Sequence, residues 1–215
     1  CSQVSLPVNL HAPLPSLPPR PDLKPRGSAL ARGLLGLFGW RVLFQGFPAR
    51  QGVVLVYPHT SNWDFIVGVL VKWALGVPVR YWGKDSLFKI PLIGAWARWI
   101  GGIPVDRKNP KGLVGATVTQ VQAAKTTDEY FWLAAAPEGT RSYVPGWRSG
   151  AYQVAVQAEV PVGLAYFDVP SKTFGIVDFL QPSGDVDRDF AAFQRVLGDK
   201  KGFKPELASP IRLKP

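Results

Sequence analysis

The amino-acid sequence predicts an α/β fold with a mostly parallel sheet. Short runs rich in β-branched and aromatic residues alternate with amphipathic or buried helical segments along the chain, which is the pattern of strand–helix–strand units. The chain has 215 residues, of which 47% are hydrophobic. This length and apolar content fit one globular domain and exclude disorder of the whole chain.

Residues 1–27 hold seven prolines, which remove backbone donors and favour extended conformations, so we expect an N-terminal arm followed by one domain over residues 28–215. In that domain the sequence predicts helices at residues 28–38, from 62 onward behind an N-cap at Ser61 or Asn62, at 111–125, 151–158 and 188–197, and an interrupted helical segment at 86–99. The predicted strands are residues 40–47, 53–57, 77–82, 103–105, 130–136, 162–167 and 174–180.

The charge balance points to an anionic partner. Lysine and arginine number 25 against 15 acidic residues, which gives a net charge of +10 beside eight tryptophans and twelve phenylalanines. A nucleic acid, a membrane surface and a phosphorylated substrate all fit this composition. One cysteine excludes a disulfide scaffold, and two histidines argue against a multi-histidine metal cage, so no metal site is expected.

The first residues of the chain raise the question of location. There is no methionine, and the single cysteine is Cys1, followed by Ser2, as at the start of a processed lipoprotein. A trimmed chain or an ordinary cytoplasmic thiol is the favoured interpretation. No run of about 18 apolar residues is present, so a membrane-spanning helix is not predicted.

His59 is the first candidate catalytic residue. It follows the predicted strand VVLVY and precedes a capped helix, which places it at the carboxyl edge of the sheet, where open α/β sheets bind their ligands. Asp64, in the first turns of that helix, is positioned to bind one imidazole nitrogen and to leave the other as a proton acceptor. No G-x-S-x-G motif supplies a nucleophile. The simplest chemistry is therefore deprotonation of a substrate hydroxyl that attacks an acyl group directly.

Two further loops carry candidate binding residues. The segment Pro137–Ser142 follows the buried run YFWLAAA and supplies the carboxylate of Glu138, a close-approach glycine at Gly139 and the guanidinium of Arg141. The segment Gly101–Arg107 adds a glycine turn and a second arginine. An ordinary polar turn and a surface salt bridge between Asp106 and Arg107 are the structural alternatives.

Taken together, HTSNWD, GGIPVDR and APEGTRS, in this order and spacing, resemble the PlsC-like lysophospholipid and glycerolphosphate acyltransferases. The resemblance covers about residues 40–180 and implies a single αβ domain with a mixed, mostly parallel sheet flanked by helices. It implies His59 as general base and Asp64 as its orienting carboxylate, without a covalent intermediate. The substrate-binding residues that it implies are Lys84, Gly101, Arg107, Glu138, Gly139, Thr140 and Arg141. Glu138 would bind acceptor hydroxyls, and the arginines would bind the acceptor phosphate.

The same resemblance implies the substrates. The donor would be acyl-CoA or acyl-carrier protein, the acceptor a lysophospholipid or glycerol phosphate, and no cofactor or metal would be needed. Two departures from the family pattern put the acceptor in doubt: Ala136 replaces the usual aromatic residue, and only Pro161 remains of two expected prolines. A non-glycerolipid acceptor, such as an ornithine-type lysolipid, a glycolipid or a natural product, therefore stays open as an alternative. A non-catalytic lipid-binding module is the third hypothesis.

Peripheral contact with an anionic membrane, at the inner face of the cytoplasmic membrane, is the expected location. Apolar residues near 34–47 and 87–100, flanked by Arg32, Arg41, Lys89 and Arg98, suit such a surface, although many of these aromatic residues are equally suited to a core. Nucleic acid is not expected as a partner, because the aromatic residues lie in apolar runs and not among basic residues.

Overall fold

The computed structural model describes residues 14–105 and 110–214. Cys1, on which the lipoprotein alternative depends, and Arg107 lie outside the described residues. Residues 14–27 run along the domain: Leu14 and Leu23 are buried, and the N–H of Leu17 donates to the carbonyl of Phe179 at 2.6 Å. None of the helices formed by the described residues combines the length and the apolar character needed to cross a bilayer.

The described strands form one seven-stranded sheet. Its order is β1 (Arg41–Phe44), β7 (Thr173–Leu180), β6 (Val162–Asp168), β2 (Gln51–Tyr57), β5 (Phe131–Ala135), β3 (Val79–Lys84) and β4 (Gly102–Val105). All neighbouring pairs are parallel except β6 and β7. The predicted mixed, mostly parallel sheet is therefore confirmed, with β1 and β7 running against the other five strands.

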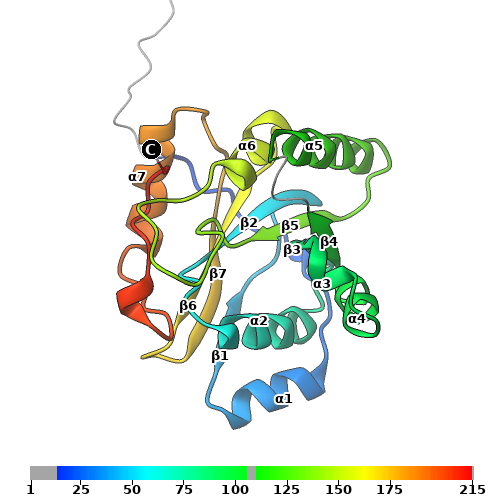
Figure 1. Ribbon diagram of the computed structural model, residues 1–215, viewed down its shortest axis with the longest axis vertical. Coiled ribbons are helices and arrows are strands. Elements are labelled where there is room, and N and C mark those ends of the chain that lie inside the picture. The colour runs from blue at the N-terminus through cyan, green and yellow to red at the C-terminus, as the bar shows by residue number, and fades with distance from the viewer. Residues whose placement is uncertain (1–13, 106–109, 215) are drawn as a thin grey trace, which may run out of the picture.

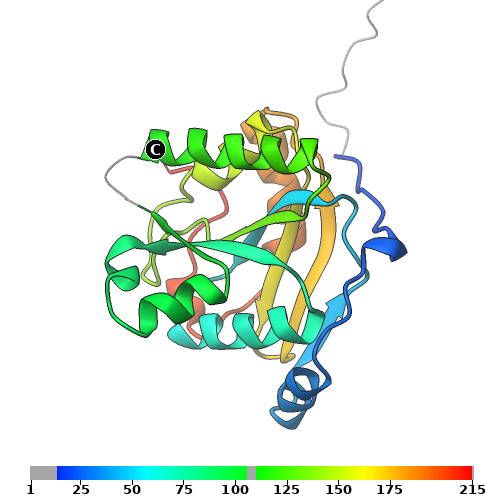
Figure 2. The same cartoon turned by 90° about the vertical axis from the view of Figure 1, so that its right-hand side faces the viewer.

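Helices cover both faces of this sheet (Figures 1 and 2). The helices α1 (Ala29–Leu37) and α2 (Asn62–Leu75) lie on one face, and α5 (Pro110–Thr126), α6 (Gly150–Gln157) and α7 (Val186–Leu197) lie on the other. Two short helices, α3 (Asp85–Phe88) and α4 (Ile93–Trp99), connect β3 to β4, and single 3₁₀ turns occupy Pro21–Leu23 and Pro205–Leu207.

Alternation along β2 divides the core into two layers. Val53, Leu55 and Tyr57 pack toward α5, α6 and α7, whereas Val54 packs toward α1 and α2. Successive side chains of a strand point to opposite faces, so a strand buried on both faces reads as a continuous apolar run, as VVLVY does. Trp132 of β5 belongs to the α2 layer, where its ring stacks on Phe47 at 4.3 Å between centroids.

The predicted helical segment 86–99 is interrupted, as expected. Pro91 separates α3 from α4, and Leu92, the residue before α4, has a left-handed φ of 63°. The predicted strand at 40–47 is shorter in the structure and ends at Phe44, because the chain turns at Gly46, whose φ is 133°. A positive φ of this kind leaves the strand geometry and suits glycine.

Candidate active site

His59 lies between two parallel strand ends. It follows β2, and Glu138 follows β5, which is the neighbour of β2 in the sheet with Leu55 paired to Ala135. Because parallel strands end at the same edge, the loops behind them meet there. The N–H of His59 donates to Oε2 of Glu138 at 2.6 Å, which joins the two predicted motifs directly.

The spacing between His59 and Asp64 follows from a capping box at the start of α2. Ser61 is the N-cap, and Asp64 is the third residue of the helix. Oδ2 of Asp64 accepts the N–H groups of Thr60 and Ser61, each at 2.7 Å, and so satisfies backbone donors that would otherwise lack partners. The position also favours a negative charge, because the amino end of a helix is electropositive.

The same oxygen of Asp64 faces the histidine ring. Nδ1 of His59 lies 3.3 Å from Oδ2, and the side chain of Asp64 is 0% exposed against 19% for that of His59. A buried carboxylate at this distance holds the proton on Nδ1, which leaves Nε2 as the acceptor nitrogen. The pair thus has the arrangement of a general base and its orienting group.

Glu138 is fixed behind the site. Oε2 accepts the N–H of His59 at 2.6 Å, Oε1 accepts the N–H of Ser209 at 3.1 Å, and the residue is 2% exposed. Burial raises the pKa of the Glu138 carboxyl above its usual value, and the two backbone hydrogen bonds oppose that rise.

Gly139 allows the side chain of Arg148 to pass close to the backbone of the loop after β5. Its φ is 68°, and a Cβ added there would lie 2.5 Å from Nε of Arg148. A side chain is strained at that φ, and the arginine would have to move to admit a Cβ, so the position favours glycine. Within the described part of the chain, neither Arg141 nor Arg148 forms an ion pair with a carboxylate. Their guanidinium groups are available to an anion at the edge of the site.

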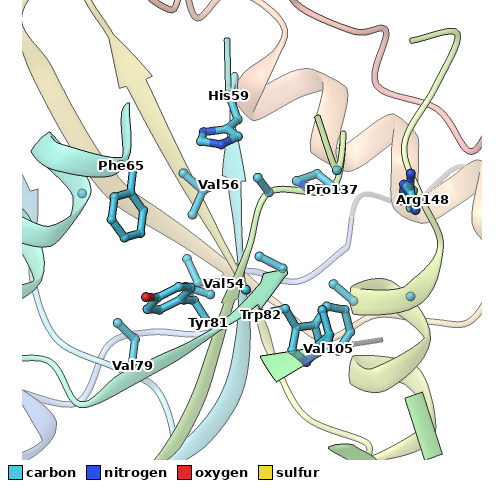
Figure 3. Close-up of a pocket in the computed structure, with 18 of the residues that line it drawn as sticks. Val54, Val56, His59, Phe65, Val79, Tyr81, Trp82, Val105, Pro137 and Arg148 are labelled. Carbon is cyan, nitrogen blue, oxygen red and sulfur yellow. The ribbon is translucent and has the colours of Figure 1, made fainter. Parts of the chain in front are cut away.

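A cavity of about 1970 Å³ opens at His59. Figure 3 shows the imidazole at one end, with Val56, Phe65, Val54, Tyr81 and Val79 following it along the cavity. One wall is α2, from Asp64 to Leu75, which corresponds to a length of about 16 Å at 1.5 Å per residue. The cavity therefore follows most of the length of α2 and is lined mainly by apolar side chains.

An amino group also lines the cavity. It belongs to Lys72 of α2, eight residues beyond Asp64, and its Nζ donates to the carbonyl of Ile100. Burial lowers the pKa of Lys72. Gly101, next in the chain, turns there with φ 94° before β4.

The structure brings most of the predicted site residues to one place. Besides His59 and Asp64, the cavity is lined by Lys84, Gly139, Thr140 and Arg141. Glu138 stands behind this wall with both oxygens bound to backbone N–H groups. Gly101 is not brought to His59: an added Cβ would lie 2.7 Å from the carbonyl of Val79, the first residue of β3, at the opposite edge of the sheet.

The sequence predicted no role for two of the residues that take part in the site. Arg148 lines the cavity beside Gly139, and its only signal was its place in the segment WRSG shortly after APEGTR. Ser209 binds Glu138 from 71 positions along the chain. No motif marks it, so only the fold reveals it.

The comparisons with known proteins agree with this geometry. The family model described as "Acyltransferase" matches residues 41–166, which is more than half of the chain and includes both loops of the site. The chain belongs to the acyltransferase family. This membership and the fold confirm the family that the three motifs predicted.

Among curated relatives, the human 1-acyl-sn-glycerol-3-phosphate acyltransferase alpha is 32% identical over 133 residues, which are 59% of this chain and 45% of that protein. The chloroplastic 1-acyl-sn-glycerol-3-phosphate acyltransferase BAT2 of Brassica napus is 27% identical over 107 residues, or 48% of this chain and 30% of that protein. The chain thus spans less than half the length of these relatives.

A solved structure shares the fold of this chain. The 1-acyl-sn-glycerophosphate (LPA) acyltransferase PlsC from Thermotoga maritima superposes with a TM-score of 0.50 at 17% identity, over 78% of this chain and 73% of that one. At this identity the likeness concerns the fold.

Proposed function

We propose that this protein is a 1-acylglycerol-3-phosphate acyltransferase, which transfers a fatty acyl group from acyl-CoA or acyl-carrier protein to the free hydroxyl of a lysophosphatidate. One observation carries the proposal: the buried Asp64 carboxylate orients His59 where an apolar cavity of about 1970 Å³ begins. A thioester held with its chain in that cavity would present its carbonyl carbon to an acceptor hydroxyl at the imidazole. The family relatives are named for this activity.

The chemistry follows from the protonation of His59. Nε2 takes the proton of the acceptor hydroxyl as that oxygen bonds to the thioester carbonyl carbon, and Asp64 stabilises the imidazolium that forms. When the tetrahedral intermediate collapses, the C–S bond breaks and the imidazolium returns its proton to the leaving thiolate. The products are phosphatidate and the free thiol, and no group on the protein is acylated.

The acceptor phosphate has a cationic edge available to it. Lys84 ends β3, and Arg141 and Arg148 lie on the loop after β5, so these three cations come from the edge where the parallel strands end, and all three line the cavity. A guanidinium binds phosphate through two parallel hydrogen bonds, which both holds and orients the ligand. Arg107, predicted to share this task, lies outside the described residues.

The direct test is turnover by the purified protein. With an acyl-CoA and lysophosphatidate, we expect phosphatidate to form in step with free CoA, as seen by mass spectrometry and a thiol assay. The His59→Ala variant should lose both products. An acceptor panel with monoacylglycerol, glycerol 3-phosphate and an ornithine-type lysolipid decides the acceptor class, and equal rates with unphosphorylated acceptors would contradict the proposed one.

We further propose that the protein reaches its substrates on an anionic membrane through α4 and the turn before it. Leu92 and Trp99 are 85% and 73% exposed, and Ile93 and Trp96 are both exposed and part of the cavity lining. A surface that continues into the cavity gives an acyl chain an apolar path from the bilayer. Lys89 and Arg98 lie beside it, where they would attract acidic headgroups.

Vesicle flotation tests this contact. Trp99→Ser combined with Leu92→Ser should lower binding to vesicles that contain phosphatidylglycerol, while turnover of a short-chain, water-soluble acyl-CoA stays unchanged. Val177→Ser, an exposed apolar position on β7, is the matched control. Unchanged flotation of the double variant would contradict the proposed surface. Of the predicted apolar residues, Leu35, Phe44, Phe47, Phe88 and Ile100 are buried in the core and cannot take part.

A further inference from the structure

The C-terminal strap, residues 202–214, crosses the back of the active site. It follows α7, appears in red in Figure 1, and lies outside residues 41–166, which the family model matches. Ser209 is 1% exposed and Ile211 is 7% exposed, so the strap is packed into the domain. Its backbone also pairs with the loop after β5, because the N–H of Trp147 donates to the carbonyl of Arg212 at 2.7 Å.

The first link between the strap and His59 is the Glu138 carboxylate. One oxygen accepts the N–H of His59 and the other that of Ser209. Each oxygen of the carboxylate accepts one backbone N–H, and Glu138 is not among the described residues that line the cavity. Such a group holds two chain segments at a fixed separation, whereas a group that binds an acceptor hydroxyl needs a free oxygen facing the cavity.

The second link runs through Thr60, the residue after His59. Its hydroxyl oxygen accepts the N–H of Lys204 at 3.1 Å, and the residue is 2% exposed. The strap also passes close to this loop at Gly202, where an added Cβ would lie 2.8 Å from the Thr60 hydroxyl and 2.9 Å from Cγ of Pro58. The strap thus contacts the loop of residues 58–60 on both sides of His59.

We propose that the C-terminal strap is a positioning element of the catalytic base: through Glu138 and Thr60 it holds the backbone of His59 where Asp64 and the cavity require it. The inference rests on the proposed acyl transfer only for its kinetic consequence. It assigns Glu138 as a positioning residue and replaces the expectation that it binds acceptor hydroxyls.

Glu138→Gln separates the two roles. The amide keeps the size of the side chain but has only one oxygen, so it must lose either the His59 or the Ser209 hydrogen bond. Its NH2 group then faces the backbone N–H that has lost its acceptor, which places two hydrogen-bond donors opposite each other. Glu138→Asp retains both acceptor oxygens on a shorter stem and should recover part of the activity. Glu129→Gln is the matched control, because Glu129 is an exposed carboxylate at the other end of β5.

Gly202→Ala tests the strap from its own side. The added methyl group meets the Thr60 hydroxyl and Pro58 closer than 3.0 Å, so it must push the strap from the loop. Lys201→Ala changes an exposed side chain one position earlier and serves as the control. Thr60→Val removes the acceptor of the Lys204 N–H with little change in volume.

We expect Glu138→Gln and Gly202→Ala to lower kcat by on the order of 10²-fold, the effect of a small misplacement of a catalytic group, with the acceptor KM within about twofold. A second readout does not depend on turnover. Because the chain has two histidines, His11→Gln leaves one imidazole for NMR. In that background both variants should shift the His59 ring signals and speed amide exchange at His59 at least tenfold.

The outcomes are distinct. A raised acceptor KM in Glu138→Gln, with an unchanged kcat and unchanged His59 exchange, would overturn the proposal in favour of acceptor binding. Unchanged kcat and unchanged His59 signals in Gly202→Ala would overturn the role of the strap. If the unaltered protein transfers no acyl group, the proposed function fails, yet the His59 signals of the same variants still decide whether the strap positions the loop.

Discussion

Asp64→Asn isolates the charge of the orienting carboxylate. All three contacts of Asp64 converge on Oδ2, and Oδ1 has no hydrogen-bond partner among the described residues. Asparagine can therefore keep its carbonyl oxygen on the backbone donors of Thr60 and Ser61 and place its amide group where Oδ1 was. The geometry survives, while the negative charge beside the imidazolium is lost.

The size of the effect follows from the distance. A unit charge 3.3 Å from the ring contributes about 5 kcal/mol at an effective dielectric constant of about 20. The His59 side chain is 19% exposed, so screening makes this an upper limit. We expect kcat to fall by on the order of 10²- to 10³-fold. Asp64→Ala also removes two charge-assisted hydrogen bonds and should lower the free energy of unfolding by about 3 to 6 kcal/mol.

Two assays carried out together decide this prediction. Acyl transfer to lysophosphatidate gives kcat, and urea unfolding followed by tryptophan fluorescence gives stability. Asp64→Asn should be slow but lose less stability than Asp64→Ala, because it keeps both backbone hydrogen bonds as neutral ones. An Asn variant that keeps more than a tenth of the unaltered kcat would refute the charge argument.

Three further predictions concern the cavity, its mouth and the core. Gly68→Leu should shift the preference toward shorter acyl chains, by about fourfold in kcat/KM per methylene. The reason is that Gly68 lines the cavity, where an added Cβ would lie 3.8 Å from Phe167. Measuring kcat/KM for a series of acyl-CoA chain lengths checks this prediction. Arg148→Ala should raise the KM for lysophosphatidate about 10- to 100-fold but leave that for monoacylglycerol unchanged. Burial raises the pKa of the Tyr57 hydroxyl from 10.0 to about 12. Between pH 10 and 12 this hydroxyl ionises in the unfolded chain but stays neutral in the folded protein. The stability that the neutral hydroxyl contributes is therefore complete below pH 10 and is lost between pH 10 and 12. Tyr57→Phe should reduce that alkaline loss by about 2 kcal/mol in urea unfolding at each pH.

The sequence predicted those parts of the site that are formed by residues close together in the chain. Ser61, Asp64 and the strand before them specify a capped helix at a strand end, and that geometry alone brings the carboxylate to His59. The apolar run VVLVY predicted a strand, and the structure buries most of its residues. The fold class followed from the alternation of such runs with helices.

The rest depends on contacts between distant segments. Ser209 reaches Glu138 only because the strap returns along the sheet edge after α7, and nothing near residue 209 indicates this. Gly101 was grouped with Arg107 because the two are close in sequence. The four residues of β4 follow Gly101, and a strand advances about 3.3 Å per residue, so the chain leaves Gly101 about 13 Å behind at the opposite edge.

The most direct test of the central claim is a single comparison of product formation. Purified unaltered protein and His59→Ala are each given an acyl-CoA and lysophosphatidate, and phosphatidate and free CoA are measured together. We expect equal amounts of both products from the unaltered protein and neither above background from His59→Ala. Phosphatidate formation by His59→Ala at the unaltered rate, or none by the unaltered protein, would contradict it.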